Sequence, residues 1–444
     1  MRYEKRGKMR KRRIGRLLAV VSVTGVLTAC GAKVETQVAV DEIITEESTL
    51  QMTQTAEGVY NGTEAEVVIE NNKIATDIID ETTVPTTEAV TEIQTEISDE
   101  PAQVDIVMVG DILLHTRVNE SGLMEDGTYN YDHMFAQVKE DITAADLALV
   151  NQEVILGGTE LKLSGYPNFN GAFEVGDSLV DAGFDVVLHA TNHALDKGKK
   201  GLLRCLEFWD TTYPEIGVVG IHDTAEDAEE IYVKEIEGIR IAILNYTYGT
   251  NGIALPSDMP YAVDMWDKQA VAEDVARAQE ISDFVIVCPH WGTEYVFEET
   301  ASQKKQAQFL ADLGVDLVIG THPHVVEPVK WITGENGNET LVYYSIGNFI
   351  NATSGNHTGA AARMLGAMAQ VTVVMEDGEA VIANYGVEPL VTHLVEGKGQ
   401  ITTYRMADYT EELAAKNQMR LQDDSFSLQY CIDICDKVFG DLYK

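Results

Sequence analysis

The sequence has 444 residues, of which 45% are hydrophobic and 7% aromatic, enough to bury the core of one large domain or two average ones. The formal net charge is −40, from 72 acidic and 32 basic residues. This balance argues against a nucleic-acid partner, which would require a basic face, and it fits an extracellular surface or a site for hard metal ions.

Residues 1–30 have the pattern of an export signal. A basic segment over residues 2–16 precedes a short apolar run from Leu17 to about Leu27, shorter than the roughly 20 residues of a transmembrane helix. The run ends in Leu27-Thr28-Ala29-Cys30-Gly31, which resembles a bacterial lipobox with Cys30 as the lipidated residue. We therefore predict a lipoprotein that lies outside the cytoplasmic membrane and is anchored to it by lipid. The alternative is an uncleaved signal anchor with an incidental cysteine.

The next segment, residues 31–102, is rich in Thr and Glu and contains no Trp or Phe. Stretches such as residues 81–88 have too few apolar side chains to bury a core. Like charges keep such a chain extended. The segment is predicted to be a disordered linker between the membrane and the folded domain.

From Val104 onward, short apolar runs alternate with amphipathic stretches, which is typical of an α/β domain. The expected strands are Asp105–Val109, Leu147–Val150, Val186–His189, Ile239–Asn245, Phe284–Cys288, Leu317–Ile319 and Leu341–Ser345. The expected helices are Ala194–Thr211, Lys268–Ile281 and Ser302–Leu313. We predict one domain over residues 103–395.

Two pairs of strands in this domain are expected to form hairpins. The pairs are Ile231–Ile236 with Ile239–Leu244, and Met368–Met375 with Ala380–Gly386. Tight turns at Glu237-Gly238 and Asp377-Gly378 join them. Antiparallel pairs beside parallel strands predict a mixed sheet, or two sheets packed as a sandwich.

Residues 396–444 are predicted to be a C-terminal helical extension, with a surface helix over Ser425–Leu442. Two of the five cysteines, Cys431 and Cys435, lie one helical turn apart in it and are expected to be half-buried. A disulfide between them would be geometrically awkward. The sequence has no C-x-x-C pair, so neither a zinc ribbon nor a thioredoxin-like site is expected.

Residue types that bind metals follow directly after the apolar strands. The segments are Val109-Gly110-Asp111 with His115, Asn151-Gln152-Glu153, Thr191-Asn192-His193, Pro289-His290-Trp291-Gly292-Thr293-Glu294, Gly320-Thr321-His322-Pro323-His324 and Ser345-Ile346-Gly347-Asn348-Phe349. Residues just past the carboxyl ends of strands converge at one edge of an α/β sheet, where sites are usually built. Each segment alone has a simpler interpretation as a turn, a helix cap or a buried histidine.

His322-Pro323-His324 is the most specific of these segments. We expect Pro323 to hold the backbone extended, so that the side chains at i and i+2 point the same way. Two imidazoles on one side of a rigid loop would make a metal clamp.

Together, these segments resemble the parts of calcineurin-like metallophosphoesterases. More specifically, they are similar, in order and spacing, to the signature of the CapA family of bacterial capsule and poly-γ-glutamate synthesis proteins, from about residue 104 to 390. The resemblance implies an α/β fold, a metallophosphoesterase-like mixed β-sandwich flanked by helices (αββα). It also implies two divalent metal ions, and the mixed N and O ligands suit Mn, Zn or Fe.

The resemblance further implies a role for individual residues. Glu153 would bridge two metals; Asp111 and His324 would complete one site; Asn192, His290 and His322 would complete the other. His193 would act on the substrate as a hydrogen-bond donor or general acid. Residues expected near the substrate or behind the ligands are His115, Asn151, Asp196, Glu294 and Asn348. For Asp196 we favour a cap of the following helix over a role in orienting His193.

The sequence departs from the wider superfamily at two positions. Leu113 stands where a first-strand histidine would be, with His115 as its nearest substitute, and the bridging group is Glu153 where the superfamily uses Asp. The first metal site is therefore expected to be the weaker one, and one metal to bind loosely.

Two functions follow as hypotheses. The first is an extracytoplasmic metal-dependent hydrolase or transferase in capsule or poly-γ-glutamate biosynthesis, acting on a phosphoester or on the γ-amide backbone. The second is a non-catalytic assembly or polymer-handling factor that keeps the fold. The expected partners are the cytoplasmic membrane, through the lipid anchor, and a cell-surface polymer or its synthase complex.

Overall fold

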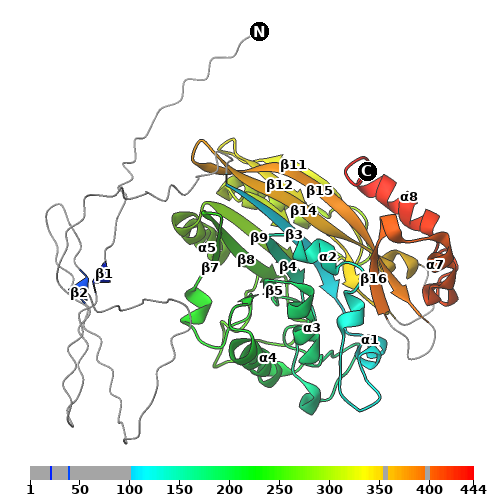
Figure 1. The fold of residues 1–444 in the computed structure, drawn as a ribbon. Helices are drawn as coiled ribbons and strands as arrows, with labels where there is room; N and C mark the ends of the chain where they lie inside the picture. The colour runs from blue at the N-terminus through cyan, green and yellow to red at the C-terminus, as the bar shows by residue number, and fades with distance from the viewer. Residues whose placement is uncertain (1–20, 23–38, 41–101, 354–358, 396–400) are drawn as a thin grey trace, which may run out of the picture. The chain divides into compact units, whose positions relative to one another are not determined.

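The computed structural model describes residues 21–22, 39–40, 102–353, 359–395 and 401–444 (Figure 1). The chain divides into two compact units, Met1–Ile93 and Gln94–Lys444. In the first unit, β1 (Val21–Ser22) pairs antiparallel with β2 (Ala39–Val40). The rest of the expected signal, including Cys30, and nearly all of the expected linker lie outside the described residues. No helix within the described ranges is long and apolar enough to cross a membrane.

The second unit is built on two mixed sheets. The larger sheet has the order β16-β15-β14-β3-β4-β5-β6, with β13 paired to β3, and the six-stranded sheet has the order β11-β12-β10-β9-β8-β7. The strands of the larger sheet are β3 (Gln103–Ile112), β4 (Leu147–Asn151), β5 (Val186–Leu188), β6 (Gly217–Val219), β13 (Asn348–Ile350), β14 (Leu365–Glu376), β15 (Glu379–Leu394) and β16 (Ile401–Arg405). Those of the other sheet are β7 (Tyr232–Ile236), β8 (Ile239–Thr247), β9 (Phe284–His290), β10 (Leu317–Ile319), β11 (Val329–Thr333) and β12 (Glu339–Tyr343).

Eight α-helices lie in the described part of this unit. They are α1 (Thr116–Ser121), α2 (Lys139–Thr143), α3 (Glu174–Ala182), α4 (Gly198–Thr212), α5 (Lys268–Ile281), α6 (Ala301–Leu313), α7 (Glu411–Lys416) and α8 (Leu428–Val438). A short 3-10 helix, Ala361–Met364, precedes β14.

Alternating side chains of the six-stranded sheet show how the layers stack. On β9, Phe284, Ile286 and Cys288 belong to the core shared with β3, β4 and β5, and the Sγ of Cys288 lies 3.8 Å from the Sδ of Met108. Their neighbours Val285 and Val287 face α5 and α6 in a second core. On the other side of the molecule, α3 and α4 pack against the larger sheet, whose strands β4 and β5 are buried along their whole length. The layers therefore run helix, sheet, sheet, helix. The expected mixed β-sandwich flanked by helices is confirmed.

Both predicted hairpins form. The turn residues Glu237 and Gly238 have φ values of 50° and 81°, and Asp377 and Gly378 have 51° and 86°, as a two-residue hairpin turn requires. The second hairpin places β14 beside β3, so the two ends of the domain share one sheet (Figure 1).

Two expected elements differ from the structure. The helix expected over Ala194–Thr211 begins only at Gly198, because the preceding residues form turns that carry site side chains. The C-terminal segment is not only helical: β16 pairs antiparallel with β15 and extends the larger sheet. Cys431 and Cys435 lie on α8 as expected, but both are fully buried, and they are not bonded to each other.

Candidate metal centre

The carboxyl ends of the parallel strands of both sheets meet at one end of the sandwich. In the larger sheet, β3, β4 and β5 are parallel and lead into Asp111, Glu153 and Asn192. In the other sheet, β9 and β10 are parallel and lead into His290 and the His322–His324 loop. The two sheets thus bring side chains more than 200 residues apart in sequence into contact: Nδ1 of His324 lies 3.0 Å from Oδ2 of Asp111.

The described part of the chain contains three groups of residues whose potential ligand atoms lie within 4.8 Å of one another inside each group. The groups are Glu153 with His290 and His322, Asp111 with Glu153 and His324, and Glu294 with His322 and His324. Glu153 belongs to two of them, which is the geometry that the expected bridging role requires. Glu294, expected only near the substrate, is an exposed member of the third group.

Glu153 is the centre of this cluster. Its side chain is completely buried, and neither carboxylate oxygen has a hydrogen-bond partner among the described residues. Oε1 lies 3.7 Å from Nε2 of His290, and Oε2 lies 3.7 Å from Nδ1 of His324. Burial raises the pKa of Glu153 well above its ordinary value, partly offset by His324. A buried carboxylate without donors is costly unless a cation neutralises it.

His290 and Asn192 form one side of the cluster. Nε2 of His290 lies 2.9 Å from Oδ1 of Asn192, and its Nδ1 lies 2.9 Å from Oγ1 of Thr321. Thr321 thus holds the ring with Nε2 facing Glu153. Burial lowers the pKa of both His290 and His322 well below the ordinary value, so the imidazoles are neutral, which is the form that binds metals.

Asp111 and His324 form the other side. Nδ1 of His324 lies 3.0 Å from Oδ2 of Asp111 and 3.1 Å from Oδ1 of Asn348. Asn151 donates from Nδ2 to Oδ1 of Asp111 at 2.8 Å, so it orients the carboxylate from behind. Burial by itself lowers the pKa of His324, but Glu153 and Asp111 raise it to about 9.

The backbone of the His322–His324 loop is not extended, contrary to expectation. His322 has φ of 97° and His324 has φ of 59°, both in the left-handed region. The two imidazoles still converge, with ring centroids 5.7 Å apart. Left-handed conformations at non-glycine residues are unfavourable outside turns, and they are enriched at functional sites.

Asp196 does not cap the following helix. The residue before α4 is Lys197, which makes no side-chain cap, whereas Oδ2 of Asp196 lies 2.7 Å from Nδ1 of His193. The same oxygen accepts from the backbone N–H of Phe169 at 2.7 Å. Asp196 therefore orients His193, whose Nε2 lies 3.9 Å from Oε1 of Glu153.

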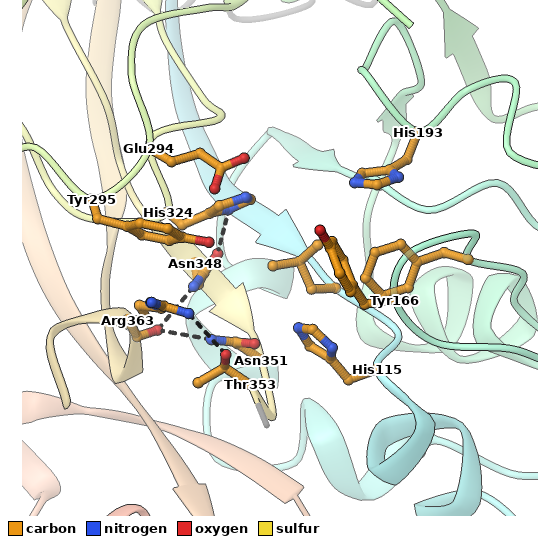
Figure 2. Close-up of a pocket in the computed structure, with 12 residues that line it drawn as sticks. His115, Tyr166, His193, Glu294, Tyr295, His324, Asn348, Asn351, Thr353 and Arg363 are labelled. Carbon is orange, nitrogen blue, oxygen red and sulfur yellow. Dashed lines mark hydrogen bonds between the residues drawn. The ribbon is translucent and has the colours of Figure 1, made fainter. Parts of the chain in front are cut away.

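A cavity of about 440 Å³ opens beside the cluster (Figure 2). His193, Tyr166 and His115 line one side, and Glu294 and Arg363 lie on the other. His115 is in the cavity wall and in none of the three groups of potential ligand atoms among the described residues. Burial lowers its pKa to about 4, with smaller effects of His324 and Arg363, so His115 is a neutral wall residue.

Several residues of the site were not among the site residues predicted from the sequence. Arg363, Tyr295, Tyr166, Asn351 and Thr353 line the cavity, Tyr248 packs over His322 at 4.6 Å between ring centroids, and Asn251 approaches His193. Tyr295 ends the family-like signature segment that begins at His290, but no role was predicted for it. Arg363 lies 14 residues after Phe349, the end of the last segment identified in the sequence, and only the fold brings it to the cavity.

Over residues 105–353 the chain matches the family described as bacterial capsule synthesis protein PGA_cap. This match covers more than half of the sequence. The chain belongs to this family. All the residues that form the buried cluster lie within the matched range, and the CapA-type family expected from the sequence is confirmed.

Two relatives are similar to the chain over shorter stretches. The PGA biosynthesis protein CapA of Bacillus subtilis is 32% identical over 175 residues, which are 39% of this chain and 44% of that protein. The capsule biosynthesis protein CapA of Bacillus anthracis is 26% identical over 286 residues, which are 62% of this chain and 66% of that protein. The chain thus matches less than two thirds of the length of either relative.

Solved structures with a similar arrangement share little sequence with this PGA_cap protein. A 5'-nucleotidase precursor from Thermus thermophilus has 15% identity and a TM-score of 0.41, covering 65% of this chain and 54% of that one. The calcineurin-like phosphoesterase YfkN from Bacillus subtilis has 13% identity and a TM-score of 0.36, covering 78% and 98%. At these values the similarity carries no information about activity.

The residues of the cluster fit divalent cations. The unpartnered oxygens of Glu153 and the buried Nδ1 of His322, which also has no described partner, lie in one cluster with the imidazoles of His290 and His324 and a second carboxylate. Removal of such groups from water is offset when they coordinate a metal. The donor set of nitrogen and carboxylate oxygen suits transition metals better than Ca²⁺.

Proposed function

We propose that this PGA_cap-family protein is an extracytoplasmic, lipid-anchored, divalent-metal-dependent hydrolase or transferase in capsule or poly-γ-glutamate biosynthesis. The observation that carries the proposal is the buried Glu153 carboxylate, shared by two groups of potential ligands and without a hydrogen-bond partner among the described residues. The sequence of the first 31 residues supports the anchor at Cys30, and the names of the two relatives support the polymer pathway.

Each residue of the cluster has a task in this proposal. Glu153 would be common to both metal positions; Asp111 and His324 would complete one, and Asn192, His290 and His322 would complete the other. When bound, divalent cations neutralise charge on a substrate oxygen and lower the pKa of water. Mn, Zn or Fe is expected, with the Asp111 position the weaker because Leu113 contributes no ligand.

His193 is the residue that handles a proton at the leaving group. Asp196 accepts from its Nδ1, which leaves Nε2 directed toward the cluster and the cavity. When both ring nitrogens carry a proton, Nε2 donates to a substrate oxygen as a general acid or hydrogen-bond donor. A phosphoester is the preferred substrate, and the γ-amide of a polyglutamate chain is the second.

The alternative is a non-catalytic assembly or polymer-handling factor that retains the fold and one metal. The observation in its favour is Leu113, which lies in the cavity wall at the place where a ligand histidine would complete the weaker position. Its partners would be the polymer or the synthase complex. Turnover of a generic phosphodiester by the purified protein with added Mn²⁺ would count against it.

Metal content of the purified full chain tests the proposal. His290→Ala and His322→Ala should each lose most of the bound metal measured by mass spectrometry, because each removes a neutral nitrogen donor. His133→Ala is the matched control, since His133 is half-buried and contacts Ser121 on α1, away from the cluster. Unchanged metal in the two cluster variants would overturn the proposal.

A further inference from the structure

The cavity beside the cluster has two chemically different ends. One end is formed by His324, Glu294 and His193, next to Glu153, and the other by Arg363 and Thr353 (Figure 2). With a volume of about 440 Å³, the cavity has space for more than the single group that would react at the cluster. The far end therefore needs its own explanation.

Arg363 is held rigidly at this far end. Its guanidinium carbon lies 3.7 Å from the centroid of the Tyr295 ring, and Nη1 donates to Oγ1 of Thr353 at 3.0 Å. Cation–π stacking and one hydrogen bond fix the plane of the group before any ligand arrives. The Nε atom is buried and, among the described residues, has no partner.

The charge of Arg363 is not balanced by a carboxylate of the described chain. Of the other six described arginines, four pair with acidic residues within 4.0 Å: Arg204, Arg240, Arg277 and Arg405. No described carboxylate stands in this relation to Arg363. In a protein of 72 acidic and 32 basic residues, a half-buried arginine without an acidic neighbour is conspicuous. An anionic ligand would supply the missing partner.

We propose that Arg363 forms an anion subsite, which binds a second acidic group of the substrate while the reacting group lies at the Glu153 cluster. The acidic group is a carboxylate or a phosphate. The position of the reacting group rests on the proposed function, whereas anion binding at Arg363 does not depend on turnover. Arg363 is thus a specificity-determining residue, and Tyr295 positions it.

The side chain of Arg363 can be substituted without removing the hydrogen bond that its backbone makes to Asn348, the neighbour of His324. Asn348, which contacts His324, donates from Nδ2 to the backbone carbonyl of Arg363 at 2.9 Å, and a substitution leaves this carbonyl in place. Arg363→Gln removes the charge, and Arg363→Lys keeps the charge but loses the planar fork. Arg420→Gln is the control, because Arg420 is exposed on a different element and its guanidinium donates, among the described residues, only to the Ala415 carbonyl.

Calorimetric titration of the Mn²⁺-loaded full chain tests the subsite without turnover. The probes are methylphosphonate, which has one acidic group, and phosphonoacetate, 3-phosphonopropionate and 4-phosphonobutyrate, which add a carboxylate at increasing distance. Methylenediphosphonate replaces the carboxylate by a second phosphonate and so distinguishes the two kinds of anion. At least one two-anion probe should bind about 10-fold or more tightly than methylphosphonate.

Arg363→Gln should abolish the preference for the two-anion probe and leave methylphosphonate binding unchanged. Arg363→Lys should retain part of this preference, and Arg420→Gln should retain all of it. Equal binding of all probes to the parent protein, or an intact preference in Arg363→Gln or Arg363→Lys, would overturn the subsite. The proposed function has a separate readout, because methylphosphonate should bind only when Mn²⁺ is present. If that requirement fails, Arg363-dependent binding of glutarate to the chelator-treated protein still supports the subsite, and its absence overturns it.

Discussion

Oδ2 of Asp196 lies 2.7 Å from Nδ1 of His193, and the same oxygen accepts the backbone N–H of Phe169. The backbone of Phe169 therefore fixes the Asp196 carboxylate, and the carboxylate in turn fixes the His193 imidazole. Its oxygen acceptor favours the tautomer with the proton on Nδ1, so the relationship determines which nitrogen of His193 faces the cavity.

Asp196→Asn should disturb this tautomer while leaving the metal content unchanged. An amide can present its NH₂ group to Nδ1, which would move the proton of the neutral ring to Nε2, and it removes the negative charge that stabilises the doubly protonated ring required of a general acid. We expect turnover of a generic phosphodiester with Mn²⁺ to fall about 10-fold or more. Nitrogen NMR of labelled His193 reports the tautomer directly. Asp210→Asn on α4 is the control, and an unchanged His193 spectrum in Asp196→Asn would contradict the assigned role.

Glu153→Gln should have opposite effects on stability with and without metal. In chelator, the substitution removes a buried ionisable group that lacks a donor among the described residues, so the melting temperature should rise by a few degrees, or about 1 kcal/mol. With Mn²⁺, the parent should be stabilised by binding and the variant should not. Thermal unfolding in both buffers measures the difference. A parent melting temperature that is indifferent to Mn²⁺ would argue against the site.

Gly110→Ala should destabilise the domain and the cluster together. A Cβ at this position of β3 would overlap the carbonyl oxygen of Gly347, which accepts the backbone N–H of Asp111. Because both partners are backbone, relief requires β3 to separate from the chain at Gly347, directly before β13, and we expect a loss of about 3 kcal/mol or more.

Chemical unfolding of Gly110→Ala measures this loss. Gly249→Ala is the matched control, because a Cβ added there would meet no heavy atom within 4 Å and the φ of Gly249 is not in the left-handed region. A change of less than about 0.5 kcal/mol is expected there, as for ordinary surface substitutions. Similar stability of the two variants would show that the contact with Gly347 does not constrain β3.

His222 should make stability fall as the pH rises from neutral to alkaline. Its ring nitrogens lie 3.1 Å from Asp227 and 3.0 Å from Asp264. Burial lowers its pKa, but the two carboxylates raise it from 6.5 to about 9. The folded protein therefore binds this proton more tightly than the unfolded chain does. The contribution is complete below pH 6.5 and is lost as the pH rises through 9.

Denaturant unfolding between about pH 6 and pH 9.5 measures this contribution, and the difference should disappear in His222→Gln. Because the Asp227 side chain is 46% exposed, solvent screens part of the interaction, and about 1 to 2 kcal/mol is expected. A pH dependence that is the same in parent and variant would place the cause at other groups.

The sequence by itself determined the order of the strands that lead to the site and the residue types at their ends. Apolar runs such as Phe284–Cys288 must be buried, and the polar residue that follows each run must leave the sheet at its carboxyl end. These are local consequences of composition and periodicity, so Asp111, Glu153 and His290 can be identified from the sequence alone. The two hairpins can be identified for the same reason, since their turn residues tolerate positive φ.

Only the tertiary structure decided how the side chains are directed and what completes the cavity. The left-handed backbone of His322 and His324, which brings the His322 N–H to Asp111 of the other sheet, is opposite to the extended form that Pro323 favours locally. Asp196 has a sequence position that suits a helix cap, but the contact with His193 and Phe169 takes precedence. Arg363 has no local pattern at all, because its stacking on Tyr295 joins segments that are distant in sequence. Such contacts depend on long-range packing, which sequence periodicity does not encode.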